Sequence, residues 1–99
     1  MEKRGYVYFI GDSNHTGIKI GFSKKPQRRL HELQIANSSK LEILYLIPNA
    51  SKNTETFYHN YLSSYLQLSG EWYEYDYVSK WIKYDKKQKK VLREEGLIK

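Results

Sequence analysis

Residues 5–23 constrain the fold more than any other stretch of the chain. They have the sequence GYVYFIGDSNHTGIKIGFS, in which two short apolar runs flank a polar, turn-rich insert. Aromatic and β-branched residues fill Tyr6 to Ile10, and glycine, aspartate, serine and asparagine follow them, which are typical turn residues. The pattern predicts a β-hairpin, against which the rest of a small chain would pack.

Side-chain alternation gives this hairpin two different faces. One face is apolar and carries Val7, Phe9, Ile18, Ile20 and Phe22. If like faces pair, the more polar face brings Tyr8 near Lys19 and Ser23. We expect Gly21 on that face to leave backbone open to a ligand, because glycine has no side chain to cover it. The polar face is therefore a candidate floor for a binding site.

The residues after the hairpin predict a helix and a further strand. Pro26 is favourable in the first turn of a helix, and this helix is expected to run to about Ala36, where an Asn-Ser pair stops it. Residues 40–47, KLEILYLI, predict a third strand that is central in the sheet or covered on both sides. The following Pro-Asn pair is expected to end this strand.

Two more helices are predicted in the second half of the chain. Ser51 is a suitable N-cap for a helix that runs to about Leu66, with an apolar stripe made by Tyr58, Tyr61, Leu62, Tyr65 and Leu66. Residues 70–75, GEWYEY, are expected to wall the core through Trp72. A last helix should run from Asp76 to about Glu95, packed through Val78, Trp81 and Ile82.

These elements predict an α+β fold with a small three-stranded antiparallel sheet flanked by helices, in the order β-β-α-β-α-α. Ninety-nine residues are too few for two hydrophobic cores, so residues 1–99 are expected to form one domain. We see no internal repeat, low-complexity linker or phosphate-binding glycine loop.

The charge of the chain favours a polyanionic partner. The formal net charge is +6, with seventeen lysines and arginines against eleven acidic residues. Much of the excess lies on the predicted last helix, where a lysine-rich face suits binding to a phosphate backbone without sequence specificity. The alternatives are a helix that is merely solvated and a basic charge that serves only solubility. The absence of cysteine excludes disulfides and thiolate metal sites.

Helical geometry singles out one arginine. With about 100° of rotation per residue, Leu30 and Leu33 define the buried stripe of the first helix, and Arg29 lies at its margin about 40° from Leu33. Arg28 points about 140° away from the same leucine. Arg29 alone can be held by packing and still present its guanidinium to the sheet, although a surface arginine that covers the core edge would have the same position.

The second helix carries an acid on its core-facing side. Glu55 lies about 20° from Leu62 in projection, so its carboxylate needs a partner or pays a desolvation cost of several kcal/mol. The partner is either the helix N-terminus or a cation such as Arg29 or Lys19, or else a metal ion. His59 lies one turn further on the same face. It either orients Glu55, contacts phosphate or shuttles a proton, or it is a core-edge histidine bonded to the backbone.

The hairpin and the two helical residues together resemble the GIY-YIG nuclease family. Val7 and Tyr8 stand where its first motif has Ile and Tyr, and residues 19–21, Lys-Ile-Gly, stand where its second motif has Tyr-Ile-Gly. An arginine on the next helix and a lone glutamate on the one after complete the pattern, which covers roughly residues 5–75.

One departure from the family pattern concerns the second motif. Its tyrosine is replaced by Lys19, as in a branch of the family that also carries a Gly-Glu-Trp-aromatic segment. Residues 70–73, Gly-Glu-Trp-Tyr, match that segment here.

The resemblance implies a Mg²⁺-dependent endonuclease that hydrolyses phosphodiester bonds in DNA with one metal ion, for which Mn²⁺ can substitute. Glu55 would hold the ion, Arg29 would bind a non-bridging phosphate oxygen, and Tyr8 would position the attacking water or accept its proton. Lys19 would act either as an ammonium that stabilises charge, the role we favour, or as a neutral base. His59 completes the catalytic candidates.

The remaining candidates on the hairpin and the following turn are expected to contact substrate: Gly21, Ser23 and Lys24.

Two other functions remain open at this stage. The chain could be a nucleic-acid-binding module of the same fold that has lost turnover, consistent with the replaced tyrosine. It could also be a compact partner-binding protein whose many aromatic residues form an interface.

Target choice is expected to come from outside these residues. Family members commonly take it from an appended domain and none is evident here, so we expect weak selectivity, a homodimer or a guiding partner protein. No signal peptide or long apolar run is visible. We expect an intracellular protein, in the cytoplasm or with the nucleoid or nucleus, and no membrane partner.

Overall fold

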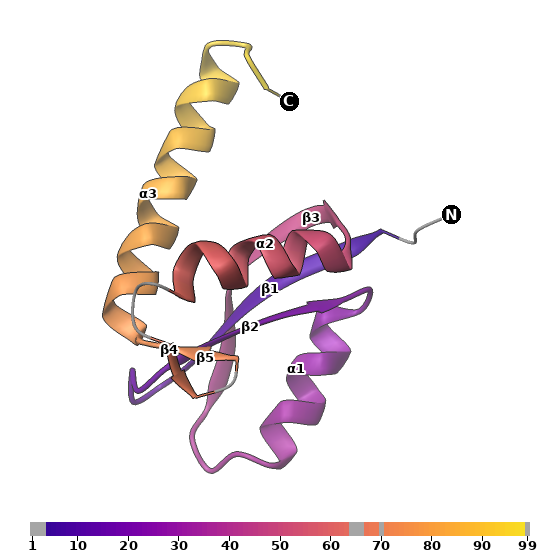
Figure 1. The fold of residues 1–99 in the computed structure, drawn as a ribbon, viewed down its shortest axis with the longest axis vertical. Coiled ribbons are helices and arrows are strands. Elements are labelled where there is room, and N and C mark those ends of the chain that lie inside the picture. Colours follow the sequence, from indigo (N-terminus) through magenta and orange to yellow (C-terminus); the bar gives the residue numbers. More distant parts are fainter. Residues whose placement is uncertain (1–3, 64–66, 70, 99) are drawn as a thin grey trace.

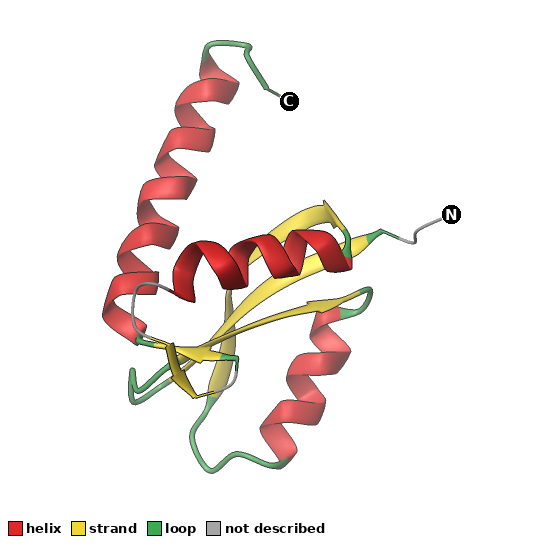
Figure 2. Cartoon of the chain, in the orientation of Figure 1, coloured by secondary structure: helices red, strands yellow, loops and turns green. Residues whose placement is uncertain are grey.

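The computed structural model describes residues 4–63, 67–69 and 71–98. The predicted hairpin is present as β1 (Gly5–Asp12) and β2 (Ile18–Ser23), which pair antiparallel. Figure 1 shows β1 and β2 running side by side through the middle of the molecule, with helices around them. The α+β class predicted from the sequence is therefore correct, and Figure 2 shows how the helices and strands are arranged.

The sheet is larger than the three strands predicted. In the described part of the chain it has five strands in the order β3-β1-β2-β5-β4. The additional strands are β4 (Gln67–Ser69) and β5 (Trp72–Tyr73), which extend the sheet beyond β2. The element order is thus β-β-α-β-α-β-β-α. Strands of three and two residues are too short to show a period of two, so the prediction missed them.

Among the described residues, three helices cover the sheet, as predicted. They are α1 (Pro26–Ile35), α2 (Lys52–Ser63) and α3 (Tyr75–Glu94). The helices α2 and α3 pack on the face that carries Val7, Phe9, Ile18 and Ile20, where Leu62, Val78 and Ile82 are buried. The helix α1 packs on the other face through Leu30 and Leu33, against Tyr8 and Ile10.

The register confirms the predicted faces of the hairpin. Tyr8 is opposite Gly21 and Phe9 is opposite Ile20, so like faces pair across β1 and β2. Phe9 and Ile20 are fully buried, and complete burial of side chains of this size stabilises a fold by about 1.5–3 kcal/mol each. Lys19 shares the second face with Tyr8, as expected. This face carries most of the candidate site residues.

The third strand differs from the prediction in its end and its place. The strand β3 (Leu41–Ala50) continues through Pro48 and Asn49, which were expected to end it, and it lies at the edge of the sheet. Gly5 pairs with Ala50 and Val7 with Ile47, so the pairing shifts by one residue and Asn49 has a φ of 54°. A bulge on an edge strand tolerates proline, because no partner needs its missing N–H.

The predicted cap of α2 is correct. Thr54 N donates to Ser51 Oγ over 3.4 Å, and Ser51 N donates to Thr54 Oγ1 over 3.0 Å. Such reciprocal bonds satisfy two backbone donors at the start of a helix. The start of α2, and with it the position of Glu55 one turn later, is fixed by this cap. Tyr65 and Leu66, which were predicted to extend the apolar stripe, lie outside the described residues.

The β1–β2 loop is held by one buried carboxylate. Asp12 accepts hydrogen bonds from Thr16 N over 2.9 Å, Thr16 Oγ1 over 2.6 Å and Gly17 N over 3.1 Å. Burial raises the pKa of Asp12, but these hydrogen bonds lower it by more, so the net pKa lies below its ordinary value. The loop also stacks His15 on Tyr75, with ring centroids 4.1 Å apart.

The long helix α3 is fixed to β3 at its middle. The hydroxyl of Tyr45 donates to the carboxylate of Asp85, Lys89 lies 3.1 Å from the same carboxylate, and Lys86 donates to Leu44 O over 3.0 Å. Lys86 and Lys89, two of the many lysines of this helix, therefore hold it in place. The last turns extend away from the sheet, as Figure 1 shows. Within the described residues, each helix is too short or too polar to cross a lipid bilayer.

Candidate functional site

Tyr8 and Arg29 meet over β2. Tyr8 is 2% exposed, and its phenol lies across the strand above Gly21, where any added Cβ would clash with the ring and the hydroxyl. The guanidinium of Arg29 on α1 interacts with this hydroxyl, and the interaction raises the pKa of Arg29. The expectation that Gly21 leaves this face open to a ligand is wrong. Its lack of a side chain instead makes room for Tyr8.

Lys19 is enclosed by Glu71 and Trp72, at the start of β5. Its Nζ lies 2.8 Å from Glu71 Oε2 and 5.8 Å from the centre of the Trp72 ring, and its side chain is 13% exposed. Ile20 N also donates to Glu71 O over 3.1 Å, so residue 71 is joined to β2 by its backbone as well. The ammonium group is held between the Glu71 carboxylate and the Trp72 ring.

Glu55 and His59 form the third part of the site. The Glu55 side chain is 14% exposed, and its Oε2 lies 3.8 Å from His59 Nε2. His59 Nδ1 shares a hydrogen bond of 2.6 Å with the Tyr73 hydroxyl, which sets the orientation of the imidazole. Burial, and to a lesser extent the charge of Glu71, raises the pKa of Tyr73. His59 therefore bonds to a side chain rather than to backbone alone, and one ring nitrogen faces Glu55.

Glu71 connects these parts into one cluster. Its carboxylate, that of Glu55 and a ring nitrogen of His59 lie within 4.8 Å of one another. Burial raises the pKa of Glu71, but the hydrogen bond and charge of Lys19, together with the charges of His59 and Arg29, lower it by more. Residues from β2, α1, α2 and the start of β5 are thereby brought together at one place.

Glu71 is the residue that the sequence prediction missed. Its Gly-Glu-Trp-Tyr context was noted as part of the family resemblance, but only Trp72 was given a structural role. Because its partner Lys19 lies 52 residues away, no spacing rule connects the two side chains. The segment match itself was the available signal, since it placed an acid among the few residues shared with a family branch. Gly70, which opens that segment, lies outside the described residues.

A shallow basic hollow adjoins Arg29. It has a volume of about 350 Å³ and is lined by Ser23, Lys24, Lys25, Arg28, Arg29 and Glu32. Ser23 Oγ accepts a hydrogen bond from Lys25 N over 3.0 Å, which shapes the turn into α1. Ser23 and Lys24, expected to contact substrate, thus lie beside the arginine that the sequence analysis selected. Arg29 itself is half-exposed and reaches Glu32 at 3.5 Å.

The edge of β2 between these groups is open. In the described residues, β5 pairs with Ile18 and Lys19 of β2 and Ile20 N donates to Glu71 O, whereas residues 21–23 of β2 pair only with β1. The helix α1 covers one face of the sheet beside this edge and α2 covers the other. A polyanion that approaches the edge would meet cations from both β2 and α1, with carboxylates beside them. This charge pattern suits a phosphate group together with a divalent cation.

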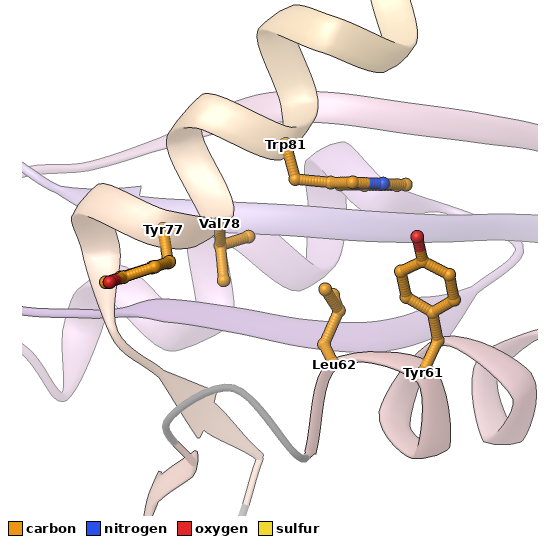
Figure 3. A pocket seen from close by; sticks show the side chains of 5 residues that line it. All are labelled: Tyr61, Leu62, Tyr77, Val78 and Trp81. Atoms are coloured by element: carbon orange, nitrogen blue, oxygen red, sulfur yellow. The ribbon is translucent and has the colours of Figure 1, made fainter.

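A separate cavity lies between α2 and α3. It has a volume of about 230 Å³ and is lined by Tyr61, Leu62, Tyr77, Val78 and Trp81. Figure 3 shows these mainly aromatic and aliphatic side chains facing one another across the gap between the two helices. None of them carries a charge that could bind phosphate or a metal ion. The cavity is therefore distinct from the charged cluster around Glu71.

Comparison with known protein families decides the affiliation of the chain. Residues 5–91 match the T5orf172 domain. The chain belongs to the T5orf172 domain family. This family is GIY-YIG-like and associated with nucleases, so the resemblance noted in the sequence is correct at the level of the family. No significant match was found among curated proteins or among solved structures.

Membership in the T5orf172 domain family gives the chain a general function. It is a nuclease-like or DNA-binding module. The match begins at the first residue of β1 and ends within α3, so it includes the elements that carry Tyr8, Lys19, Arg29, Glu55 and Glu71.

Proposed function

We propose that this T5orf172 domain is an endonuclease that hydrolyses phosphodiester bonds in DNA with the help of a single Mg²⁺ ion, for which Mn²⁺ can substitute. The observation that supports this most strongly is the convergence of two cations, Lys19 and Arg29, with the Glu55–His59–Glu71 cluster at the open edge of β2. Hydrolysis of a phosphodiester needs positive charge on the phosphate and oxygen donors for a metal ion in the same place.

The donor set fits a divalent cation. Two carboxylates and one imidazole offer ligand atoms within 4.8 Å of one another, and the Glu55 carboxylate is mostly buried. Mg²⁺ is commonly held by one or two carboxylates with water and substrate phosphate, and Mn²⁺ accepts imidazole as well. Glu55 would be the main ligand, and the bound cation would supply positive charge to the scissile phosphate and the leaving oxygen.

The side chains of the domain have distinct roles in this proposal. Arg29 binds a non-bridging phosphate oxygen with its planar guanidinium, which lies next to the Tyr8 hydroxyl. Lys19 adds charge next to the same phosphate. Tyr8 positions the attacking water or accepts its proton through a hydroxyl that is held in place above Gly21. His59, held by Tyr73, orients the carboxylate of Glu55.

Two observations extend the proposal. Lys19 in the second motif and the Glu71–Trp72 segment beside it suggest that this domain belongs to the branch of the GIY-YIG family with lysine at that position. The exposed lysines of α3 supply affinity for the DNA backbone without sequence preference.

A second candidate function is DNA binding without turnover. It is favoured by the ion pair between Lys19 and Glu71, which neutralises one of the two cations that hydrolysis requires. Such a module would bind DNA in a salt-dependent way through its remaining basic residues.

Plasmid nicking separates the two functions. Supercoiled DNA is incubated with the wild type and with Glu55→Ala, each with Mg²⁺ and with EDTA. The endonuclease proposal expects the wild type to nick the plasmid in Mg²⁺ but not in EDTA. The nicking rate of Glu55→Ala in Mg²⁺ should be lower by at least about a hundredfold. Salt-dependent DNA binding without nicking would establish the binding module instead.

A further inference from the structure

Glu71 lies between Lys19 and the other two members of the cluster. Lys19 occupies one of its oxygens at 2.8 Å, while Glu55 and His59 lie within ligand distance of a shared ion, and the charge of Arg29 also acts on it. The carboxylate therefore lies where two different ligands compete for it. One is the ammonium of Lys19, and the other is a divalent cation.

The position of Glu71 also overlaps with that of substrate. Lys19 and Arg29 are the cations that would bind a phosphate, yet both act on this carboxylate in the absence of DNA. A carboxylate paired with Lys19 has the charge and oxygen acceptors of a phosphate group, so it occupies the place that a phosphate on Lys19 needs. The Glu71 side chain is 48% exposed, so neighbouring side chains do not prevent it from changing partners.

We propose that Glu71 is an exchangeable ligand, which binds Lys19 when the site is empty and binds the metal ion when a DNA phosphate replaces it on Lys19. The proposal rests on the nuclease function above and adds a third metal ligand, together with a coupling between metal and DNA. A DNA phosphate on Lys19 would release Glu71 for the metal ion, and a metal ion on Glu71 would release Lys19 for DNA, because both favour the separation of Glu71 from Lys19. Metal and DNA should therefore bind with positive cooperativity.

The test compares Glu71→Gln with wild type in three measurements. Glutamine keeps the size of the side chain but removes the charge that binds both Lys19 and the metal. Mn²⁺ binding is followed by the loss of the free-ion signal in electron paramagnetic resonance. Binding of a fluorescent DNA duplex is followed by anisotropy in EDTA, where cleavage is absent, and again with Ca²⁺ as a non-catalytic cation.

The proposal expects opposite changes in the two affinities. Glu71→Gln should bind Mn²⁺ at least about tenfold more weakly, since it loses a ligand. It should bind DNA in EDTA about threefold to fivefold more tightly, since a charge that repels phosphate is removed and Lys19 is released. The gain in DNA affinity that Ca²⁺ gives the wild type should be smaller in the variant, because Glu55 and His59 can still hold a cation beside the phosphate but the exchange of Glu71 is lost.

Glu42→Gln is the matched control. It removes the same charge from an exposed position on β3, outside the cluster. It should leave Mn²⁺ affinity unchanged and give a smaller gain in DNA affinity than Glu71→Gln. Circular dichroism melting of both variants establishes that each is folded.

Three results would overturn the proposal: unchanged Mn²⁺ affinity in Glu71→Gln, DNA affinity in EDTA that falls or only matches that of Glu42→Gln, or a gain in DNA affinity with Ca²⁺ that is as large in the variant as in the wild type. Plasmid nicking by the wild type is scored separately. The proposed nuclease function can therefore succeed when the coupling fails, and the two failures are distinguishable.

Discussion

Gly21→Ala is expected to destabilise the domain, because Tyr8 fills the space where the new methyl group would lie. An ideal Cβ at this position clashes with both the hydroxyl and the ring of Tyr8, and the phenol is 2% exposed, so it has little freedom to move aside. Overpacking of this kind costs about 1–3 kcal/mol. Where no clash exists, the same substitution usually stabilises a protein by about 0.4–1 kcal/mol. The sign of the change alone therefore tests the packing.

The net loss should be about 1–2 kcal/mol after the two effects are combined. For a domain of this size it lowers Tm by roughly 4–16 °C. Unfolding in urea, followed by tryptophan fluorescence, gives the free energy of unfolding. Nicking activity should fall as well, because the displaced hydroxyl no longer meets Arg29.

Two comparisons make the result specific. Ser23 lies two residues further along β2 and already has a Cβ. Ser23→Ala should therefore change the free energy of unfolding by no more than about 1 kcal/mol. In a Tyr8→Leu background the added methyl group no longer meets a ring, so the cost of Gly21→Ala should largely vanish, with a coupling of about 1–2 kcal/mol. A Gly21→Ala variant as stable as wild type, or one equally destabilised in both backgrounds, would refute the reasoning.

Three further changes test other parts of the account. Lys19→Met should abolish nicking while the protein keeps its fold, measured by circular dichroism, and near-normal cleavage would remove Lys19 from the mechanism. Asp12→Asn should lower the free energy of unfolding by about 1–3 kcal/mol near neutral pH. Because the pKa of Asp12 is lowered in the folded protein, its stabilisation is present above the ordinary carboxyl pKa and is lost as pH falls through the folded value. Urea unfolding of the variant should therefore be less sensitive to acid than that of the wild type, and equal sensitivity would contradict the role of Asp12. Four exposed lysines of α3 can be replaced together by glutamine: Lys80, Lys83, Lys87 and Lys90. The slope of the logarithm of the DNA-binding constant against the logarithm of the salt concentration should fall by about 0.9 for each phosphate that the variant no longer neutralises. An unchanged slope would mean that the helix is merely solvated.

The parts of the fold that the sequence predicted well have strong local signals. Apolar and polar residues alternate clearly along both strands of the hairpin. The predictions of its strands, of its two faces and of the pairing of like faces were therefore all correct. Ser51 and Pro26 are typical residues at the starts of helices, and both helices begin where these residues indicate. The acid at Glu55 was placed on the inner side by helical periodicity, and it is mostly buried.

The parts that the sequence did not predict depend on contacts between distant residues. A proline is expected to end a central strand, but β3 lies at the edge of the sheet, where a bulge accommodates Pro48. The order of the strands cannot be read from a local sequence pattern. Gly21 was expected to expose backbone, yet the ring that covers it comes from the neighbouring strand. Glu71 directly precedes a two-residue extension of the sheet and meets Lys19 only in the folded chain.

The central claim is that side chains from the hairpin and from α2 act together on one phosphate. Single-turnover nicking by Tyr8→Phe, by Glu55→Gln and by the double variant tests it most directly, at DNA concentrations that saturate each protein. Residues that act as a unit show losses that do not multiply, so the double variant should be about as slow as the slower single variant. Losses that multiply, or a single variant that cleaves at the wild-type rate, would contradict the claim.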